Sequence, residues 1–323
     1  ERMTEAGIPV LNTPGANANA VKELVLTGLL LSSRHIVRAW DFCRRLDGDE
    51  HAQHEAVEKG KKQFVGTELA GKTIAVIGLG YIGVKVANSA RQLGMNVIGY
   101  DPKISVNNAW QLRSSVVQAD SMQQAVAAAD FVTVHVPLLP ATEGLIDQAL
   151  IQAMPAGCAL LNFARSPIVS HSAVKAALEA KHLSYYVCDF PMPQLEGHPG
   201  LICLPHLGAS THEAQDNCAV MAVEQVQAFL EHGHIINSVN FPSVKMARGN
   251  GFRLALVNRN VPNMVAQITS VLSESQLNIA NMINQSRNDI AYTLIDLEQQ
   301  CSVEQLAHLQ AIDGVVRARL IDY

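Results

Sequence analysis

Along residues 72–233, apolar segments and amphipathic segments follow one another in an order typical of α/β proteins. Short, nearly continuous apolar runs recur between amphipathic segments of helical period. The predicted strands cover residues 74–78, 95–101, 130–137, 158–165, 184–190 and 200–206, and the predicted helices cover 81–93, 121–128, 171–183 and 211–233. Strand–helix units repeated in this way predict a parallel, doubly wound sheet.

A helical pattern with a Leu- and Val-rich face covers residues 18–45, ahead of the first of these strands. Residues 1–12 have the pattern of a helix end followed by a strand, and a turn at 13–19 joins the two segments. Residues 46–63 are polar, so we expect them on the surface with their two histidines in solvent.

The composition changes over residues 237–251, a segment that ends in Gly249, Asn250 and Gly251. Such glycine-rich stretches are typical of linkers. Beyond it the pattern predicts a strand (252–258), a helix (262–275), two strands (277–286 and 289–297), a helix (302–311) and a strand (314–321). This βαββαβ order predicts a small ferredoxin-like domain.

Three glycines follow the first strand with the spacing G-x-G-x-x-G, at Gly78, Gly80 and Gly83. The spacing alone also fits a glycine-rich turn without a ligand. In a strand–turn–helix context, however, the glycines make a tight turn, let the backbone approach a pyrophosphate and let the helix pack on the strand. The next strand ends in Asp101, whose carboxylate is placed to bind a ribose 2′-hydroxyl and to repel a 2′-phosphate. The combination predicts a Rossmann-like domain that binds NAD.

Pro137, Arg165, Asp189 and His206 close four other predicted strands. Doubly wound sheets bind ligands beyond the carboxyl ends of their strands. The Arg165 guanidinium suits a substrate carboxylate and would polarise the adjacent carbonyl, and a structural ion pair is the alternative. The His206 imidazole can take an alcohol proton while hydride leaves the same carbon, and a structural histidine is the alternative.

The composition fits a chain with a sizeable core, since 48% of the 323 residues are hydrophobic and 16% are charged. The net charge of −5 argues against a nucleic-acid partner, and the apolar run at 23–31 is too short to span a membrane. The six cysteines lack metal-ligand spacing, so no metal is expected. Cys158, Cys188, Cys203 and Cys218 lie in apolar segments, which predicts buried free thiols in a reducing cytoplasm.

Several stretches together resemble the D-2-hydroxyacid dehydrogenase family. They are GIPVLNTPGANANAVKELVL, VIGLGYIG, VIGYD, DFVTVHVPLLPATEGLI, LLNFAR and LPHLGAST. With NSVNFP and the C-terminal module, the chain is most similar to the phosphoglycerate dehydrogenases within that family. The resemblance covers almost all of the chain and implies an NAD-dependent oxidoreductase that acts on a small, phosphorylated 2-hydroxy acid.

By this resemblance, Arg165 binds the substrate carboxylate and carbonyl, His206 is the acid/base, and Asn17 contacts the substrate. The implied cofactor positions are Gly78, Gly80, Tyr81, Ile82, Gly83, Asp101, Pro137, Phe163, Ala164, Asp189, Gly208 and Ala209. The implied domains are a remnant of a substrate-binding domain (1–17), an NAD-binding domain (18–210), a helix and strand returning toward the substrate domain (211–240), a linker (241–251) and an ACT regulatory domain (252–323).

Two features depart from the family pattern. The family places a Glu that holds the histidine shortly after the Asp of its DFP segment, whereas this chain has Pro193 or Gln194 there. Gln194 can orient an imidazole but carries no charge to stabilise the imidazolium, and Glu196 lies nearby, so the third catalytic role is left open. The family's leading lobe is absent ahead of Glu1, so we expect a fragment that binds NAD and need not turn over substrate.

The C-terminal module resembles an ACT domain, the amino-acid-binding regulatory module of this enzyme group. Asn258, Asn260 and Asn278 match polar positions of the family's serine pocket, and amides can bind an amino acid's carboxylate and ammonium groups. The usual RPGV is VPNM here, which leaves open whether the effector is L-serine. Local capping and turn formation are the alternative roles for these asparagines.

The expected reaction is the NAD-dependent oxidation of 3-phospho-D-glycerate to 3-phosphohydroxypyruvate, the first step of L-serine biosynthesis, under feedback control by an amino acid. Two alternatives stay open. One is another D-2-hydroxyacid dehydrogenase, acting for instance on 2-hydroxyglutarate or glyoxylate, and the other is a non-catalytic, NAD-sensing protein on the same fold. The resemblance further implies a cytoplasmic homodimer or homotetramer.

Overall fold

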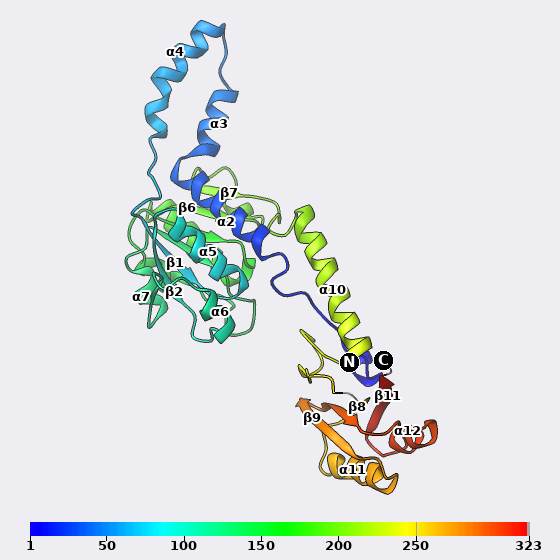
Figure 1. Ribbon diagram of the computed structural model, residues 1–323. Coiled ribbons are helices and arrows are strands. Elements are labelled where there is room, and N and C mark those ends of the chain that lie inside the picture. Colours follow the sequence, from blue (N-terminus) through cyan, green and yellow to red (C-terminus); the bar gives the residue numbers. More distant parts are fainter. Residues whose placement is uncertain (250, 322–323) are drawn as a thin grey trace. The chain divides into compact units, whose positions relative to one another are not determined.

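The computed structural model describes residues 1–249 and 251–321, and its chain forms two compact units (Figure 1). Residues 17–215 make up the first unit. Residues 1–16 join the described residues from 216 onward in the second. Asn250, near the end of the predicted linker, lies outside the described residues. The domain limits implied by the family resemblance therefore stay a prediction.

A seven-stranded parallel sheet forms the centre of the first unit, with the order β3-β2-β1-β4-β5-β6-β7. Its strands are β1 (Thr73–Ile77), β2 (Asn96–Tyr100), β3 (Val117–Gln118), β4 (Phe131–Val134), β5 (Cys158–Asn162), β6 (Leu183–Cys188) and β7 (Leu201–Cys203). The strand order reverses between β1 and β4, the place where doubly wound sheets bind ligands. The predicted doubly wound sheet is confirmed.

Helices cover both faces of this sheet. Ile74 and Val76 of β1 pack in one apolar cluster with α2 (Ala18–Ser33) and α5 (Tyr81–Gln92). Ala75 and Ile77 pack in another with α7 (Met122–Val126), α8 (Gln148–Ala153) and α9 (His171–Glu179). Because both faces are buried, the strands are apolar almost without interruption, which is the pattern from which they were predicted.

The single helix predicted over residues 18–45 is wrong. The structure has two helices there, α2 and α3 (Ile36–Arg44), because the intervening His35 takes a left-handed conformation with φ 51°. The His35 ring Nδ1 lies 2.7 Å from the Tyr185 hydroxyl oxygen, and this hydrogen bond holds the break in place. Few residues other than glycine adopt positive φ, so the sequence gives no warning of the break.

The polar stretch 46–63 is a surface segment, as predicted, but it is largely helical. Helix α4 (Glu50–Gly60) has no buried residue and is followed by a 3₁₀ turn, η1 (Lys61–Phe64). The Asp49 carboxylate accepts a hydrogen bond from the Ala52 main-chain N–H and caps α4. A shorter helix, α6 (Val106–Gln111), follows β2.

The second unit contains an antiparallel sheet with the strand order β11-β8-β10-β9. Its elements are β8 (Phe252–Arg259), α11 (Met264–Glu274), β9 (Ile279–Arg287), β10 (Ile290–Leu297), α12 (Val303–Gln310) and β11 (Val315–Ile321). This is the predicted βαββαβ order. One apolar cluster lies between the sheet and the helices α11 and α12, and a second joins the opposite face to Ile235, Phe241 and Val244.

The N-terminal segment of the second unit holds less regular structure than predicted. Helix α1 (Arg2–Glu5) is a single turn. The strand expected in the later part of residues 1–12 is reduced to one bridge between Leu11 and Ser238. Helix α10 (His212–His232) leads from the first unit into the second.

The six cysteines are free thiols. Cys158 and Cys188 are buried as expected, whereas Cys203 is exposed and Cys218 is partly exposed. The prediction of four buried thiols was therefore wrong for Cys203, because β7 is an edge strand that leaves its last residue uncovered.

Candidate active site

The glycine-rich turn between β1 and α5 has one open position and two tightly packed ones. A Cβ on Gly83 would lie 1.9 Å from the Gly78 carbonyl oxygen, and one on Gly78 (φ +93°) would lie 2.9 Å from the His135 carbonyl. A Cβ on Gly80 would meet nothing within 4 Å. Two glycines thus serve close packing, and the third faces free space in front of the helix.

The N-terminus of α5 is prepared for an anion. Its N-cap residue is Gly80, so no side chain caps the first N–H groups, and no acidic residue stands in its first turn. These N–H groups and the positive end of the helix dipole suit a pyrophosphate. Tyr81 is half exposed at this end, and Ile82 packs partly against the helix layer of the core.

Asp101 follows β2, and its carboxylate forms hydrogen bonds both with the glycine-rich turn and with the loop that follows β2. Its Oδ2 accepts a hydrogen bond of 2.8 Å from the Leu79 N–H, and its Oδ1 accepts one of 2.8 Å from the Lys103 N–H. Each carboxylate oxygen keeps a further lone pair. The carboxylate is therefore held in a fixed place and can still accept ribose hydroxyl groups.

Arg165 lies beyond β5 with its guanidinium exposed. Nη1 donates a 2.7 Å hydrogen bond to the Ala164 carbonyl. Among the described residues, no carboxylate oxygen lies within 4.0 Å of the guanidinium, so the structural ion pair considered as an alternative is not formed. The guanidinium fork is thus available to an anionic ligand.

Asn162, the last residue of β5, holds the Arg165 loop and was missed by the sequence reasoning. Its buried Nδ2 donates to the Arg165 carbonyl at 3.0 Å, and its Oδ1 accepts from the Ala164 N–H at 3.1 Å. A polar residue in the otherwise apolar run LLNFAR was the available signal. The Phe163 side chain is buried, and its ring lies against Gly28 of α2.

Asp189 follows β6 and is 1% exposed, yet neither carboxylate oxygen has a well-formed hydrogen bond. Burial raises the pKa of this carboxyl group, while the neighbouring His206, the Gly208 main chain and, more weakly, Arg165 lower it. A Cβ built on Gly208 would lie 3.4 Å from Oδ2. A buried acceptor without a partner is costly, so this carboxylate suits a ligand that brings an N–H donor.

His206 lies beyond β7 with its ring exposed and 4.9 Å from the Phe190 ring. Gln194 and Glu196, the two candidates for the missing third role, lie on and beside the 3₁₀ turn η3 (Pro193–Leu195) and are exposed. Within the described residues, neither side chain forms a hydrogen bond with the His206 ring. The nearby His206 lowers the pKa of the Asp189 carboxyl group, so the two groups interact electrostatically.

The remaining predicted positions in the first unit lie in its loops and at a helix start. Pro137 is exposed beyond β4, where its carbonyl accepts a 2.5 Å hydrogen bond from Thr142 Oγ1. Asn17 is the N-cap residue of α2, and its half-buried side chain makes no capping hydrogen bond. Ala209 is exposed beside the buried Gly208. The side chains of Asp101, Arg165, Asp189 and His206 all follow the carboxyl ends of parallel strands, as predicted.

The three predicted effector residues do not come together within one chain. Asn258 is buried near the end of β8, where its Nδ2 donates to the Arg259 carbonyl at 2.8 Å and its Oδ1 has no partner. Asn260 Nδ2 donates to the Asn288 carbonyl at 2.9 Å at the same end of the sheet. Asn278 precedes β9, whose first residue pairs with the end of β10, so it lies at the opposite end.

Comparison with known proteins decides the family. Residues 33–212 match the model of the D-isomer specific 2-hydroxyacid dehydrogenase family, NAD binding domain. The chain belongs to this family. It is 32% identical to a D-3-phosphoglycerate dehydrogenase of Haemophilus influenzae, over 98% of this chain and 76% of the relative. It is 31% identical to one of Escherichia coli, over 99% and 78% respectively.

Solved structures of related proteins share the fold. An NAD⁺-bound 3-phosphoglycerate dehydrogenase of Entamoeba histolytica matches with a TM-score of 0.56 and 26% identity, over 72% of this chain and 68% of that one. The holo form of Rhodotorula graminis D-mandelate dehydrogenase matches with a TM-score of 0.65 and 24% identity, over 76% and 72%. At that identity the second match supports the fold alone.

The residues of this dehydrogenase fit NAD. Gly80 leaves space where a pyrophosphate would lie, the α5 N-terminus is uncapped, and Asp189 presents buried acceptors without partners. No cluster suited to a metal ion is found in residues 1–249 and 251–321. Over the same residues, no helix has the length and apolar character needed to cross a membrane.

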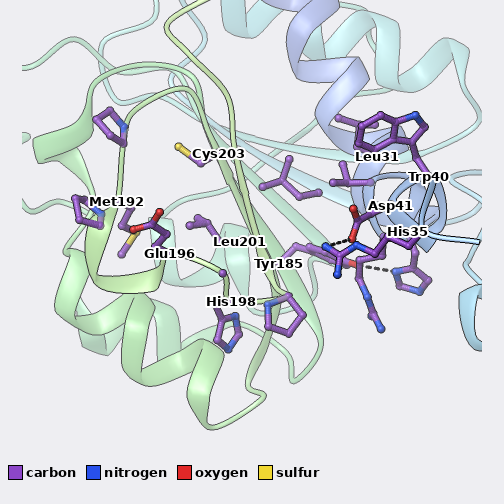
Figure 2. Close-up of a pocket in the computed structure, with 18 residues that line it drawn as sticks. Leu31, His35, Trp40, Asp41, Tyr185, Met192, Glu196, His198, Leu201 and Cys203 are labelled. Atoms are coloured by element: carbon purple, nitrogen blue, oxygen red, sulfur yellow. Dashed lines mark hydrogen bonds and ion pairs between the residues drawn. The ribbon is translucent and has the colours of Figure 1, made fainter. Parts of the chain in front are cut away.

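A cavity of about 650 Å³ lies elsewhere in the first unit (Figure 2). It extends around the edge strand β7 and reaches Tyr185 and α3, with Glu196 and His198 on its other side. Neither the glycine-rich turn nor Arg165, Asp189 or His206 lines it. Its wall does include the thiol-bearing residue Cys203.

Proposed function

We propose that this dehydrogenase oxidises 3-phospho-D-glycerate to 3-phosphohydroxypyruvate, the entry step of L-serine biosynthesis. The observation that supports this most directly is the convergence of Arg165, Asp189 and His206, whose charges interact at one sheet edge beside an uncapped helix. The two bacterial relatives named D-3-phosphoglycerate dehydrogenase, aligned over nearly all of this chain, support the choice of substrate.

In the proposed reaction, Arg165 binds the substrate carboxylate with its free guanidinium fork and polarises the neighbouring C–O bond. His206 takes the proton of the 2-hydroxyl group. The glycine-rich turn and Asp101 would hold NAD, which would supply the acceptor for the hydride that leaves the same carbon. The negative charge of Asp189 stabilises the His206 imidazolium that forms, a role that supports catalysis without the missing Glu.

Steady-state kinetics with NAD and a panel of 2-hydroxy acids test this proposal. We expect the highest kcat/KM with 3-phospho-D-glycerate. The substitution His206→Ala should lower kcat by about 10²–10⁴-fold, since it removes a general base, without changing the affinity for NAD. A clear preference for 2-hydroxyglutarate or glyoxylate would assign another member of the family. Undetectable NADH with every acid, despite normal NAD binding, would favour an NAD-sensing role.

We further propose that the C-terminal module binds an amino acid effector such as L-serine. The unpaired, buried Oδ1 of Asn258 supports this, since a ligand ammonium group could satisfy it. Because Asn258 and Asn278 lie at opposite ends of one sheet, a complete pocket would combine Asn258 of one copy with Asn278 of another in a homo-oligomer. Calorimetric titration with L-serine should show binding that Asn258→Ala weakens, and absence of heat would reject L-serine.

A further inference from the structure

Two cysteines stand side by side next to the proposed catalytic groups. Cys188 ends β6 and Cys203 ends β7, and the two residues are direct partners in the parallel register. Paired residues on adjacent strands point to the same face, and their strands lie about 4.7–4.9 Å apart. This separation falls within the roughly 4.4–6.8 Å range of Cα distances that disulfides span.

The two thiols already converge on one atom. The Phe190 carbonyl oxygen lies 3.3 Å from Cys188 Sγ and 2.9 Å from Cys203 Sγ. The thiols also interact with each other directly: burial raises the pKa of Cys188 to about 12, and the neighbouring Cys203 thiol adds to this rise. A sulfur–sulfur bond would therefore need only side-chain rotation and a small shift of the strand ends.

The pair has one accessible and one buried member. Cys203 is exposed and is one of the residues that line the 650 Å³ cavity around β7 (Figure 2). Cys188 is buried behind it. A small oxidant entering the cavity would meet Cys203 first, and Cys188, its partner in the strand register, would then be placed to react with the product.

The pair is connected to each proposed catalytic group. Cys188 directly precedes Asp189, and Phe190, whose carbonyl accepts a hydrogen bond from both thiols, has its ring in tilted contact with the His206 ring. On the other side, Cys188 contacts the Tyr186 hydroxyl group. That hydroxyl accepts a 3.4 Å hydrogen bond from Asn162, the residue that holds the Arg165 loop.

We propose that Cys203 and Cys188 form a reversible disulfide when the protein meets a hydroperoxide, and that this bond lowers NAD binding and turnover. The Cys203 sulfur attacks the peroxide, so that an S–O bond forms, the O–O bond breaks and one water or alcohol leaves. The Cys188 sulfur then attacks the sulfenic acid, so that the S–S bond forms, the S–O bond breaks and one water leaves with the sulfenic oxygen. The two thiols lose two electrons and two protons, and the peroxide gains them.

The disulfide changes the site because both sulfurs must leave the Phe190 carbonyl to approach each other at about 2.05 Å. The Phe190 ring and the His206 ring in contact with it then shift together with Asp189. Displacements of about 1 Å at a catalytic group can lower turnover by roughly 100-fold. The inference about turnover rests on the proposed function, whereas disulfide formation and NAD affinity do not.

The chemical half of the proposal is tested by mass spectrometry. The reduced chain is treated with a few equivalents of hydrogen peroxide, the remaining thiols are alkylated, and the peptides are mapped. We expect a disulfide-linked peptide that joins Cys188 to Cys203, with the other four cysteines alkylated, and complete reversal by dithiothreitol. Recovery of Cys203 as sulfinic acid, or of both residues alkylated, would overturn the proposal.

The predicted effect on NAD binding is tested by titrating the same samples with NAD. Binding is monitored through the intrinsic fluorescence of the protein. The oxidised chain should bind NAD at least about tenfold more weakly, because Asp189 has moved, and dithiothreitol should restore the affinity. The variant Cys203→Ser should keep its affinity after peroxide treatment, whereas Cys218→Ser, a partly exposed thiol outside the pair, should behave like the unchanged chain. If Cys203→Ser loses as much NAD affinity after peroxide treatment as the unchanged chain does, the peroxide acts at another residue, and the proposal is overturned.

Discussion

At the scale of single residues, the most unusual group of the candidate site is the buried carboxylate of Asp189. It is almost fully buried, lacks well-formed hydrogen bonds and interacts electrostatically with His206 and Arg165. Such groups are expensive for folding and are retained where a ligand or a reaction uses them. The sequence indicated its place at a strand end, but it could not indicate that the carboxylate would be left without partners.

Replacing the Asp189 carboxylate with an amide should raise the stability of the protein while it lowers turnover. Burial raises the pKa of Asp189, so the folded chain holds a proton that the unfolded chain has already released. Folded stability is therefore lost as pH rises from the unfolded pKa, about 3.9, through the folded one. We expect Asp189→Asn to be more stable than the unchanged chain above this window and equal to it below, in urea unfolding at a series of pH values.

The same variant should be a weaker enzyme, because the amide cannot stabilise the His206 imidazolium. Its kcat should fall by an amount comparable to the loss of a general base, about 10²-fold or more. An Asp189→Asn protein that is less stable at neutral pH would contradict the assignment of a raised pKa. One with unchanged kcat would remove Asp189 from the mechanism.

At the scale of elements, alanine substitutions at two positions of the glycine-rich turn test two different roles. An alanine methyl at Gly83 would lie 1.9 Å from the Gly78 carbonyl oxygen, so Gly83→Ala must displace α5 from the sheet. An alanine methyl at Gly80 would point into free space, and the backbone there, with φ −75° and ψ −165°, accepts any residue. Only the second methyl stands where the pyrophosphate of NAD would lie.

We therefore expect opposite outcomes from the two alanine variants. Gly83→Ala should lose several kcal/mol of stability, on the order of 1–3 or more, as overpacked cores do. Gly80→Ala should lose no more than about 1 kcal/mol, because alanine is a poorer N-cap than glycine, yet should bind NAD at least tenfold more weakly. Thermal unfolding and NAD titration measure the two effects, and a stable Gly80→Ala protein with normal NAD affinity would place the cofactor elsewhere.

Elements with one dominant local signal were predictable, and those decided by tertiary contacts were not. The parallel strands are buried on both faces, so their apolar runs appear directly in the sequence. The break at His35 depends on the Tyr185 hydroxyl group, which is 150 positions away in the chain. The exposure of Cys203 depends on β7 being the last strand of the sheet, a property of topology that no local pattern contains.

At the scale of the whole molecule, one buried ion pair joins the C-terminal sheet to the rest of the second unit. Arg253, 0% exposed, binds both carboxylate oxygens of Asp296 at 2.6 and 2.8 Å. The same guanidinium donates to the carbonyls of His232, at the end of α10, and of Met246 and Ala247. The sheet is thus fastened to α10 and to the segment before residue 250 by polar contacts in addition to its apolar cluster.

This arrangement predicts that the second unit unfolds cooperatively. Breaking the ion pair should therefore lower the stability of the whole unit. Arg253→Met leaves a buried carboxylate without a partner, and it should cost about 3–5 kcal/mol. The double variant Arg253→Met with Asp296→Leu should recover most of that loss, because an apolar pair of similar volume avoids the desolvation of both charges. Urea unfolding of the two single variants and the double variant gives the coupling energy. If the single variants and the double variant are equally unstable, the carbonyl contacts to α10, rather than the ion pair, hold the sheet in place.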